Sequence, residues 1–573
     1  MIGVCNGAPE VRPLAGGPFK PSVGLSGDRR DGWCRIDGPA GRQVTRHRCM
    51  HLGYDLNLQA VRVCCKTLVP TDPNSHWVDR LFPIFRKIPN WSRQHWRAFL
   101  PLLTVFALPN LIFALLRFVL PVRRAWISID YLALGFLVCW FRGRKLYIAV
   151  VAILLYCADA ICSFSEIYYF DFGTALRYLK DLRQVSPWLT APMALALLAV
   201  ACAIAWMGCA ADMRKESRHA SLLLGAASVL LVPIWLARGV LTDSWTKQGP
   251  EVLVGSSLAT EIKESMALFN PLQSRQKTQS AAYSAAPALA YGDGSSPQNV
   301  LIILEESLGG LKNAADQDAV LAPLESPEVK ARYTFRRGSV AFFGGTVGGE
   351  MRELCDTSLG PGDSTPDTLR DCLPWKFRKL GYRTIGVHGF TKKMFDRQSW
   401  YPQIGIQELI FREELSAKLK GVCGSAFAGN CDTEVASYIG DLIAARRNQR
   451  LFIHWMTLTA HLPVDDKTAA SSQFPCENFD FTRRYHEVCN VVRVQFETNQ
   501  AVARLVLRPD LPPMTVIIAG DHAPPFLTNP LRALYQQDKV PYIILEPKPT
   551  AKTPPNVTAH ATPTKPAQPP KTN

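Results

Sequence analysis

The chain has 573 residues, enough for more than one domain, and its near-zero mean hydropathy of +0.01 averages two unlike halves. Strongly apolar runs lie mostly between residues 98 and 240, whereas residues 296–547 have the mixed composition of a soluble α/β domain. The formal net charge is +16, but much of the excess lies in the first 97 residues, beside the apolar runs and in the C-terminal tail. This distribution is typical of membrane topology signals and argues against a nucleic-acid groove.

The N-terminal region, residues 1–85, is rich in Gly, Pro and Arg and has no sustained hydrophobic period. Its start lacks the basic stretch and apolar core of a secretory signal peptide. We therefore predict a poorly ordered region. An over-extended translation start is a second interpretation of the same residues.

Five apolar segments follow, near residues 98–122, 126–141, 146–164, 188–211 and 220–240. Each is about long enough to cross a hydrocarbon core, which takes about 20 helical residues. The second segment is the shortest and carries Asp130. A buried soluble helix is the alternative for any one of them, but five in succession predict a membrane domain of five transmembrane helices over residues 86–240.

The charges that flank these segments are asymmetric. Ten Lys and Arg residues lie in the loops that would face one side and five in the loops that would face the other, which predicts a cytoplasmic N-terminus and an exported C-terminal domain. Between the third and fourth segments, residues 170–185 fit either an interfacial amphipathic helix or a solvated loop.

Six of the 16 cysteines belong to the C-terminal domain, and none of them forms a CxxC pair, which argues against a zinc ribbon or a thioredoxin site. An even number in an exported domain predicts disulfides, with six unrelated buried thiols as the alternative. Pairing neighbours in the sequence is one of fifteen possible connectivities, and it joins Cys355 to Cys372, Cys423 to Cys431 and Cys476 to Cys489.

Residues 241–295 include an Ala, Ser and Gln-rich passage that predicts a tether. Beyond it, residues 296–547 predict a mostly parallel sheet with helices between its strands. The Pro, Thr and Lys-rich tail, residues 548–573, is predicted to be disordered. The expected strands begin at Asn299 and recur near residues 339–343, 383–387, 451–457, 514–519 and 541–545.

The first of these strands, in NVLIILEESLGG, is an uninterrupted apolar run that ends in two carboxylates, Glu305 and Glu306. Such a run is typical of a strand buried on both faces, and open α/β sheets bind ligands at the carboxyl ends of their strands. We predict that Glu306 is a metal ligand, with Glu305 as the competing choice. The alternatives for an acid at this position are a solvated turn and a helix cap.

A possible nucleophile follows the strand SVAFFGG, where Thr346 comes directly after two glycines and begins a predicted helix. A hydroxyl at a helix N-terminus can approach a phosphorus atom while backbone N–H groups bind the phosphate oxygens. The alternative is an ordinary Thr helix cap, with Glu350 in the first turn.

A third stretch, MTVIIAGDHAPPF, is another apolar strand that ends at Asp521 and His522. Adjacent Asp and His can give an oxygen and a nitrogen ligand to one divalent ion, and Glu306 would add a second oxygen. An ion bound there would lower the proton affinity of the Thr346 hydroxyl. One His with carboxylates suits Mn²⁺ and Zn²⁺ alike.

The order of these motifs, N-V-x4-E-E-S, G-T-x3-E, H-G-x7-R, T-A-H-L-P and G-D-H, resembles the alkaline phosphatase superfamily. Within that superfamily the chain is similar to the lipoteichoic acid synthases and the phosphoglycerol or phosphoethanolamine transferases. The resemblance covers about residues 98–547 and implies five membrane helices followed by an extracytoplasmic sulfatase-like domain. A true sulfatase is disfavoured, because its C/S-x-P-x-R nucleophile motif is here T-V-G-G-E.

The resemblance implies that Glu306, Asp521 and His522 bind a metal together with Thr346, the residue that becomes covalently phosphorylated. It also assigns roles to three further residues. Arg397 matches an arginine that binds the substrate phosphate, Phe395 replaces a tryptophan beside the glycerol, and His461 matches a histidine that assists proton transfer. The alternatives are a surface ion pair for Arg397 and a hydrogen-bonded loop position for His461. We interpret His388 and His454 as structural.

These expectations describe an enzyme of the bacterial inner membrane with a periplasmic catalytic domain. It would transfer the head group of phosphatidylglycerol or phosphatidylethanolamine to an envelope glycan or lipid acceptor through a phospho-threonine. A metal-dependent phosphodiesterase or phosphatase that uses water as acceptor is the first alternative. The others are a non-enzymatic membrane scaffold and a transporter, although the predicted spans carry no charge cluster beyond Asp130 and Asp159.

Overall fold

The computed structural model describes most of the C-terminal half and parts of the apolar region. The predictions for residues 1–85, for nearly all of the apolar segment 188–211 and for the tail after residue 548 lie outside the described residues. The structure describes residues 106–122, 124–140, 145–169, 177–188, 217–242, 252–260, 280–282 and 299–548, and the single residues 174, 191 and 262.

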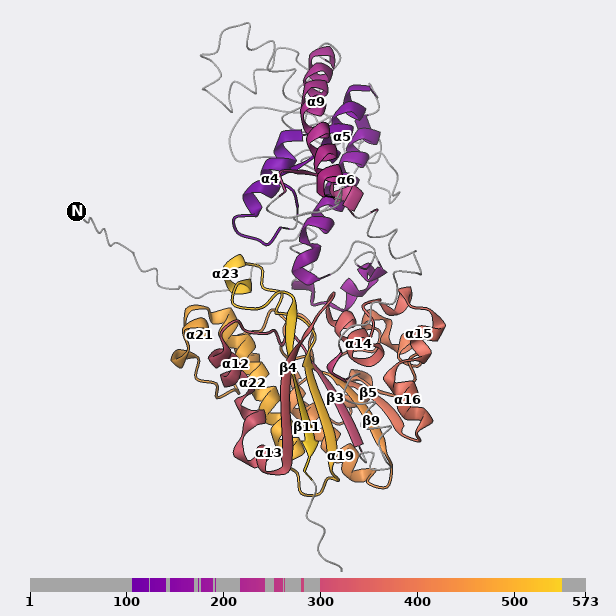
Figure 1. Ribbon diagram of the computed structural model, residues 1–573, viewed down its shortest axis with the longest axis vertical. Helices are drawn as coiled ribbons and strands as arrows, with labels where there is room; N and C mark the ends of the chain where they lie inside the picture. Colours follow the sequence, from indigo (N-terminus) through magenta and orange to yellow (C-terminus); the bar gives the residue numbers. More distant parts are fainter. Residues whose placement is uncertain are drawn as a thin grey trace, which may run out of the picture. The chain divides into compact units, whose positions relative to one another are not determined.

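The C-terminal domain is built on a seven-stranded sheet in the order β4-β11-β10-β3-β9-β5-β6 (Figure 1). Neighbouring strands of this sheet are parallel, except that β11 is antiparallel to both β10 and β4. The sheet is therefore mixed but mostly parallel, as predicted. Its strands are β3 (Asn299–Glu305), β4 (Tyr333–Ala341), β5 (Arg383–His388), β6 (Glu408–Ile410), β9 (Leu451–Met456), β10 (Met514–Gly520) and β11 (Lys539–Pro547).

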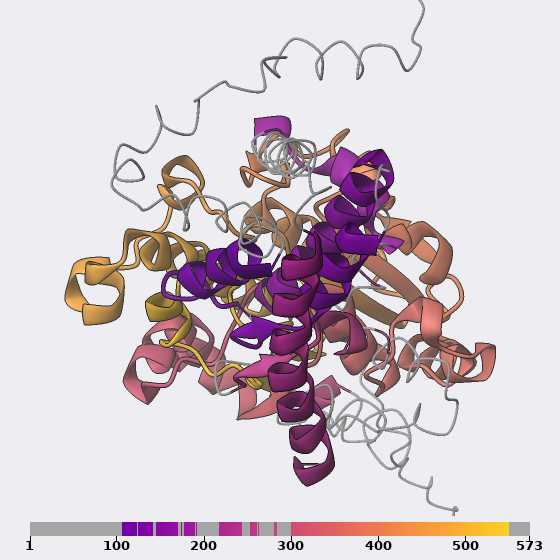
Figure 2. The same cartoon turned by 90° about the horizontal axis from the view of Figure 1, so that it is seen from above.

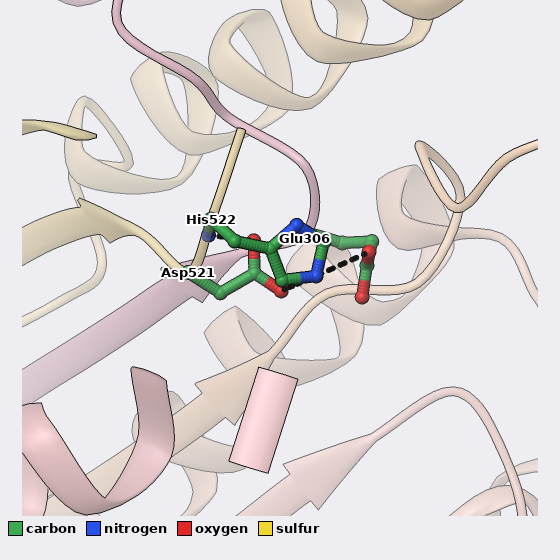
Figure 3. Close-up of side chains that lie close together, drawn as sticks. All are labelled: Glu306, Asp521 and His522. Atoms are coloured by element: carbon green, nitrogen blue, oxygen red, sulfur yellow. Dashed lines mark hydrogen bonds and ion pairs between the residues drawn. The ribbon is translucent and has the colours of Figure 1, made fainter. Parts of the chain in front are cut away.

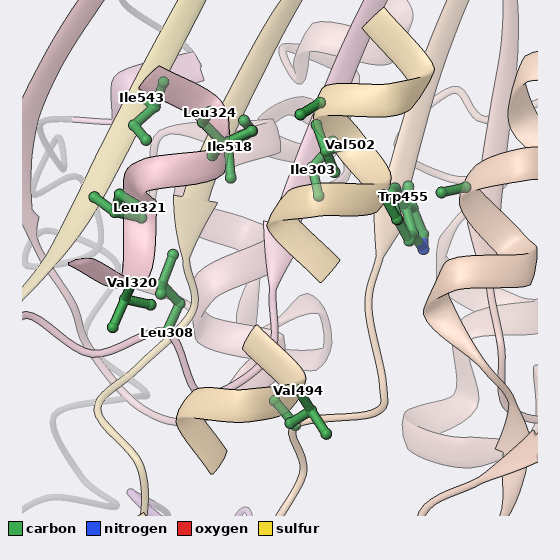
Figure 4. Packing of buried hydrophobic residues seen from close by; sticks show 14 of the residues in the cluster. Ile303, Leu308, Val320, Leu321, Leu324, Trp455, Val494, Val502, Ile518 and Ile543 are labelled. Carbon is green, nitrogen blue, oxygen red and sulfur yellow. The ribbon is translucent and has the colours of Figure 1, made fainter. Parts of the chain in front are cut away.

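Strand β3 lies at the centre of the sheet and is buried along its whole length. Its alternate residues enter two different apolar cores, because successive side chains of a strand point to opposite faces. Leu301 and Ile303 belong to the larger core, part of which is shown in Figure 4, and Val300 and Ile302 belong to the other. Burial on both faces explains why the sequence shows an apolar run here rather than an alternating pattern.

Two groups of helices cover the faces of the sheet. The smaller core contains residues of α14 (Thr346–Cys355), α15 (Pro366–Arg370), α16 (Leu373–Lys379) and α17 (Arg397–Trp400). The larger core contains residues of α12 (Ala314–Leu321), α13 (Pro327–Arg332), α18 (Arg412–Leu415), α19 (Asp432–Ala445), α20 (Asp466–Ala469), α21 (Asp480–Arg484), α22 (His486–Val506) and α23 (Asn529–Arg532).

The sequence misplaced two elements at the edges of this sheet. Strand β4 begins at Tyr333, six residues before the predicted start at Ser339, because it is an edge strand whose first half carries exposed side chains, Arg336 and Arg337 among them. Charged residues are common on edge strands, where they discourage pairing with other chains. Because they interrupt the apolar run, the first half of this strand was not predicted. Strand β6 is only three residues long and was not predicted.

All three predicted disulfides are present, with the predicted connectivity. Cys355 bonds Cys372 at the end of α14, Cys423 bonds Cys431 before α19, and Cys476 bonds Cys489 in α22. Disulfides form and persist in oxidising compartments, so the six cysteines agree with an extracytoplasmic domain.

Four of the five predicted apolar segments contain a described helix, and α5 packs against both α6 and α9 (Figures 1 and 2). Among the described residues, none of the helices has both the length and the apolar character that a membrane span requires. The helices are α4 (Leu108–Leu116), α5 (Asp130–Trp140), α6 (Lys145–Tyr168) and α9 (Ser217–Thr242).

Parts of the predicted tether are packed rather than free. Strand β2 (Val254–Gly255) pairs in parallel with β1 (Ile127–Ser128), and residues 280–282 are buried. Ser280 and Ala282 both donate hydrogen bonds to the Glu353 carboxylate on α14. The domain boundaries proposed from the sequence stay a prediction.

Candidate active site

Two neighbouring strands end together and bring their last polar side chains to one place. β3 and β10 pair in parallel with Glu305 opposite Gly520, so Glu306 and Asp521 leave the sheet side by side. The backbone then turns sharply at Ser307, which has a φ of 56° and donates its N–H to the Asp521 carboxylate at 2.7 Å. A left-handed conformation is uncommon for a residue other than glycine and often marks a functional site.

The side chains of Glu306, Asp521 and His522 form one buried cluster (Figure 3). One ligand atom from each lies within 4.8 Å of the others. His522 Nε2 is 3.3 Å from Asp521 Oδ2 and 3.7 Å from Glu306 Oε1. Tetrahedral ligands at about 2.1 Å from a metal are about 3.4 Å apart, so this spacing suits a single ion.

The ring of His522 is oriented for binding through Nε2. Its Nδ1 lies 2.9 Å from the carbonyl oxygen of Ala523. Because a carbonyl can only accept a hydrogen bond, Nδ1 carries a proton, and in the neutral ring Nε2 is then the nitrogen with the lone pair. A histidine ligand is commonly fixed in this way by a hydrogen bond from its other nitrogen.

The electrostatics of the cluster favour a bound cation. Burial raises the pKa of Glu306 well above its ordinary value, and the charge of Asp521 raises it further. Burial also raises the pKa of Asp521, and Asp521 Oδ2 is buried without a hydrogen-bond partner. Two buried carboxylates with raised pKa values beside the His522 ring fit the ligand set of one divalent ion.

Glu305 is buried as well but faces a different environment. Its pKa is raised well above the ordinary value by burial and by the charges of Asp432 and Asp521, and it does not belong to the three-residue cluster. The geometry therefore favours Glu306 over Glu305.

Thr346 is the first residue of α14 and lies beside the cluster. Its Oγ1 is 3.4 Å from Glu306 Oε2 and 3.5 Å from His522 Nε2. Gly345 occupies the N-cap position, and no side-chain capping bond is made. Interpreting Thr346 as a helix cap is therefore wrong, because its hydroxyl points to the acidic cluster rather than to backbone N–H groups.

The glycines of the TVGG sequence allow this close approach. A Cβ at Gly349 would lie 2.9 Å from the Asp521 Cβ, and one at Gly348 would lie 2.0 Å from the carbonyl oxygen of Phe343. Both distances are too short for a side chain. Glycine at position 349 lets the first turn of α14 pack against the end of β10, and glycine at position 348 lets it pack against the Phe343 backbone.

Arg397 is only 1% exposed and forms a buried ion pair with Glu350, at 3.0 Å. The alternative of a surface ion pair is therefore wrong. The guanidinium also lies over the ring of Phe395, 5.2 Å from its centroid. Phe395 and Asp396 both have a φ of 54°, so the chain makes a strained left-handed turn directly before Arg397.

His461 is half-buried, and burial lowers its pKa to about 4. It is therefore neutral at pH 7. Its Nδ1 donates to the carbonyl oxygen of Leu462 at 2.8 Å, which leaves Nε2 as the basic nitrogen. Its ring packs against Phe427 at 4.2 Å. In the described part of the chain no hydrogen bond joins His461 to the acidic cluster, so its assignment rests on chemistry rather than on a direct contact.

Sequence reasoning missed several residues near the site. Tyr169 lies with its ring 5.2 Å from the His522 ring, the Tyr178 ring is 5.0 Å from the Phe395 ring, and Asp181 accepts a hydrogen bond from the Phe395 N–H at 3.0 Å. They belong to the stretch between two apolar segments, where the structure has a short 3-10 helix, Leu179–Gln184. No local pattern connects this stretch with residues more than 200 positions later.

The chain was compared with known sequences and with solved structures. No curated protein sequence matches the chain. Among solved structures, the lipoteichoic acid synthase LtaP of Listeria monocytogenes is 14% identical, covering 46% of this chain and 71% of its own, with a TM-score of 0.34. The phosphoglycerol transferase GacH of Streptococcus pyogenes is 18% identical, covering 47% and 77%, with a TM-score of 0.34.

A third structure, the lipooligosaccharide phosphoethanolamine transferase EptA of Neisseria meningitidis, is 12% identical and covers 73% of this chain and 80% of its own, with a TM-score of 0.43. The family model described as Sulfatase matches residues 298–567, which include every strand of the seven-stranded sheet. Residues 298–567 are therefore similar to the sulfatase family.

Proposed function

We propose that this protein is a membrane-bound transferase that moves a phosphoglycerol or phosphoethanolamine head group from a phospholipid to an extracytoplasmic glycan or lipid acceptor. The observation that carries the proposal is the position of Thr346, whose hydroxyl lies 3.4 Å from Glu306 and 3.5 Å from His522. A hydroxyl held beside a buried group that fits a metal ion is suited to nucleophilic attack on phosphorus. The choice of reaction within the superfamily rests on the sequence resemblance.

The residues Glu306, Asp521 and His522 would hold one divalent ion, Mn²⁺ or Zn²⁺. When bound, such an ion supplies positive charge next to the Thr346 oxygen and the phosphoryl oxygens. Helix α14 begins at Thr346, so the backbone N–H groups of its first turn are available to the phosphate as well.

In the first half-reaction, Thr346 Oγ attacks the phosphorus of the donor phosphodiester. The bond from phosphorus to the diacylglycerol oxygen breaks, and that oxygen takes up the proton that the threonine loses. The products are free diacylglycerol and a phosphodiester that joins Thr346 to the head-group alcohol. Arg397 would bind the phosphoryl oxygens, and Phe395 would contact the head group.

In the second half-reaction, an acceptor hydroxyl attacks the same phosphorus and Thr346 leaves. His461 is neutral at pH 7, with Nε2 as its basic nitrogen, so it is suited to take the acceptor proton and return it to the threonine oxygen. Each half-reaction forms one P–O bond and breaks one, so no oxidant or further substrate is required.

Mass spectrometry of the intact protein tests the covalent step. The full chain, loaded with Mn²⁺, is mixed with vesicles that contain phosphatidylglycerol or phosphatidylethanolamine and is quenched with acid. We expect an adduct on Thr346 with the mass of the transferred phosphodiester, and the mass identifies the head group. Thr346→Ser is the conservative control, since it retains a hydroxyl.

Two outcomes contradict the proposal. Lipid consumption with no adduct in rapid-quench samples would exclude the phospho-threonine intermediate. An adduct that always decays to free glycerol phosphate or phosphoethanolamine, even with glycan and lipid acceptors present, would identify a phosphodiesterase that uses water instead.

A further inference from the structure

Glu350 lies one helical turn after Thr346 on α14. Residues four positions apart lie on the same face of a helix, so the two side chains point in similar directions. Both are buried, with Glu350 fully inaccessible. The carboxylate is therefore part of the same rigid element as the proposed nucleophile.

The Glu350 carboxylate accepts hydrogen bonds from two donors on one helical turn. Arg397 Nε lies 3.0 and 3.2 Å from its two oxygens, and Arg397 Nη2 lies 3.1 Å from Oε2. The Tyr401 hydroxyl donates to Oε1. His454 Nε2 on β9 is 3.7 Å from the same oxygen. Glu350 thus joins α14 to α17 and β9.

This pair is charged although it is buried. Burial by itself would raise the pKa of Glu350, but the charge of Arg397 and interactions with His454 lower it to about 2. The carboxylate is therefore ionised at pH 7 and offsets the guanidinium charge. An unpaired guanidinium at this depth would be strongly unfavourable.

The contacts leave one end of the guanidinium available. Arginine has five N–H donors, and the bonds to Glu350 use Nε and one hydrogen of Nη2. The hydrogen bonds of Arg397 to described residues run from Nε and Nη2 to Glu350, and the Tyr401 hydroxyl lies beside the guanidinium. Nη1 and the second hydrogen of Nη2 would be the donors left for bidentate binding of a phosphate. The charge of Arg397 opposes part of the rise in the pKa of Glu306, so Arg397 lies within electrostatic reach of the acidic cluster.

We propose that Glu350 is a residue that positions Arg397. This inference rests on the proposed function. Glu350 holds Nε and Nη2 of Arg397, so that the Nη1 side of the guanidinium faces the phosphoryl group of the donor. Because Glu350 and Thr346 lie on one helix, the distance between Arg397, which would bind the phosphate, and the proposed nucleophile Thr346 is fixed.

A second buried ion pair on the same helix shows what a purely structural pair looks like. Arg352 and Glu353 are also almost fully buried and lie 2.6 Å apart. The Arg352 Nη atoms donate to the carbonyl oxygens of Gly520 and Asp521, and Glu353 also accepts from Ser280. Every nitrogen of Arg352 thus bonds to protein. The pair centred on Glu350 differs because one end of its arginine remains free.

Binding of inorganic phosphate to the full chain tests the proposal without the lipid. Calorimetry on the Mn²⁺-loaded protein compares wild type with Glu350→Gln, Arg397→Gln and the double variant. We expect each single change to weaken phosphate binding about tenfold or more, because a charge-assisted contact is lost or misplaced. The double variant should bind no more weakly than Arg397→Gln alone, since both residues act through one contact.

The matched control is Glu408→Gln, which removes the carboxylate of a different ion pair, with Arg446 at 2.8 Å on the edge strand β6. Its phosphate affinity should equal that of wild type. Additive losses in the double variant would overturn the proposal, and so would wild-type affinity in folded, metal-loaded Glu350→Gln.

Tyr401→Phe keeps the test decisive if Glu350→Gln does not fold. It removes one donor to the carboxylate and leaves the ion pair, so we expect phosphate affinity to fall about threefold. An unchanged affinity would contradict the positioning role. The Thr346 adduct is measured separately. A chain whose phosphate binding depends on Glu350 but which forms no adduct contradicts the transfer reaction alone, and an adduct without that dependence contradicts this inference alone.

Discussion

Two buried clusters of charged side chains lie near Thr346, and they differ in how their charge is balanced. In the acidic cluster, Glu306 and Asp521 lie close together, and burial raises the pKa of both. In the ion-pair cluster, Arg397 compensates Glu350, and the pKa of Glu350 falls to about 2. Arg397 and Glu350 balance each other within the second cluster, whereas the first has the residue types and spacing that could hold a metal ion.

This difference distinguishes the acidic cluster, which is the candidate metal site, from the ion pair between Arg397 and Glu350. Burying two carboxylates close together is unfavourable, and groups with strongly perturbed pKa values gather at functional sites. Compensated pairs, by contrast, hold elements in place. The acidic cluster sits on strand ends, while the ion pair sits on α14 and α17, so substitutions should affect metal binding and phosphate positioning separately.

The largest expected effect comes from Thr346→Ala, which should change neither cluster's charge. Removing a covalent nucleophile costs on the order of 10⁴-fold or more in turnover. Metal content and thermal stability should stay at wild-type values, because the hydroxyl makes only long contacts, at 3.4 and 3.5 Å. Turnover of phospholipid by the full chain in vesicles measures the effect. Activity within tenfold of wild type would contradict the covalent mechanism.

Loss of the metal is the next largest effect, and two adjacent glutamates provide the comparison. Glu306→Gln should leave the protein with almost no bound metal by elemental analysis, because it removes one of the two anionic ligands. Glu305→Gln should retain the metal, since Glu305 lies outside the cluster. Equal loss in both variants would show that the carboxylates act together, and loss in Glu305→Gln alone would reverse the assignment.

The sequence predicted the acidic cluster better than the ion pair, for a physical reason. Strands β3 and β10 are continuous apolar runs because both faces of each are buried, and the polar residues directly after them mark the strand ends. Parallel pairing then brings Glu306 and Asp521 together without further information. A site at adjacent strand ends is thus visible in the order of residues along the chain.

The surroundings of Arg397 could not be predicted in the same way. Its partner Glu350 lies 47 positions earlier, and the pairing depends on how α14 packs against α17. The spacing of four between Thr346 and Glu350 was the only local signal, and it was interpreted as a helix cap with an acid in the first turn. The contact between Tyr169 and His522 joins residues still farther apart, and no pattern in either segment indicates it.

The third effect concerns the stability of the ion pair and its dependence on pH. Removing one partner of a buried ion pair costs about 3–5 kcal/mol, because the other charge is left uncompensated. Glu350→Gln should therefore lower the free energy of unfolding by about that amount at pH 7, measured by urea denaturation. A group with a lowered pKa in the folded state adds stability above its ordinary value of 4.5 and loses it as the pH falls toward 2.

The advantage of wild type over Glu350→Gln should accordingly be constant above about pH 5.5 and shrink below pH 4.5. Glu408→Gln serves as control, since its half-exposed ion pair contributes at most about 1 kcal/mol. A difference between wild type and Glu350→Gln that grows as the pH falls would contradict the ionised pair.

The smallest expected effect tests whether the two clusters are mechanically independent. The Cys355–Cys372 disulfide closes a loop of 17 residues at the end of α14, and the loss of such a crosslink costs about 3 kcal/mol or less. The double variant Cys355→Ser/Cys372→Ser should unfold at a lower temperature but bind metal like wild type, because the metal ligands lie on strand ends. Cys476→Ser/Cys489→Ser, which opens a loop of 13 residues in another part of the domain, is the matched control. Weakened phosphate binding in the first variant alone would show that α14 positions the anchor, whereas loss of metal in the first variant would show that the clusters are not independent.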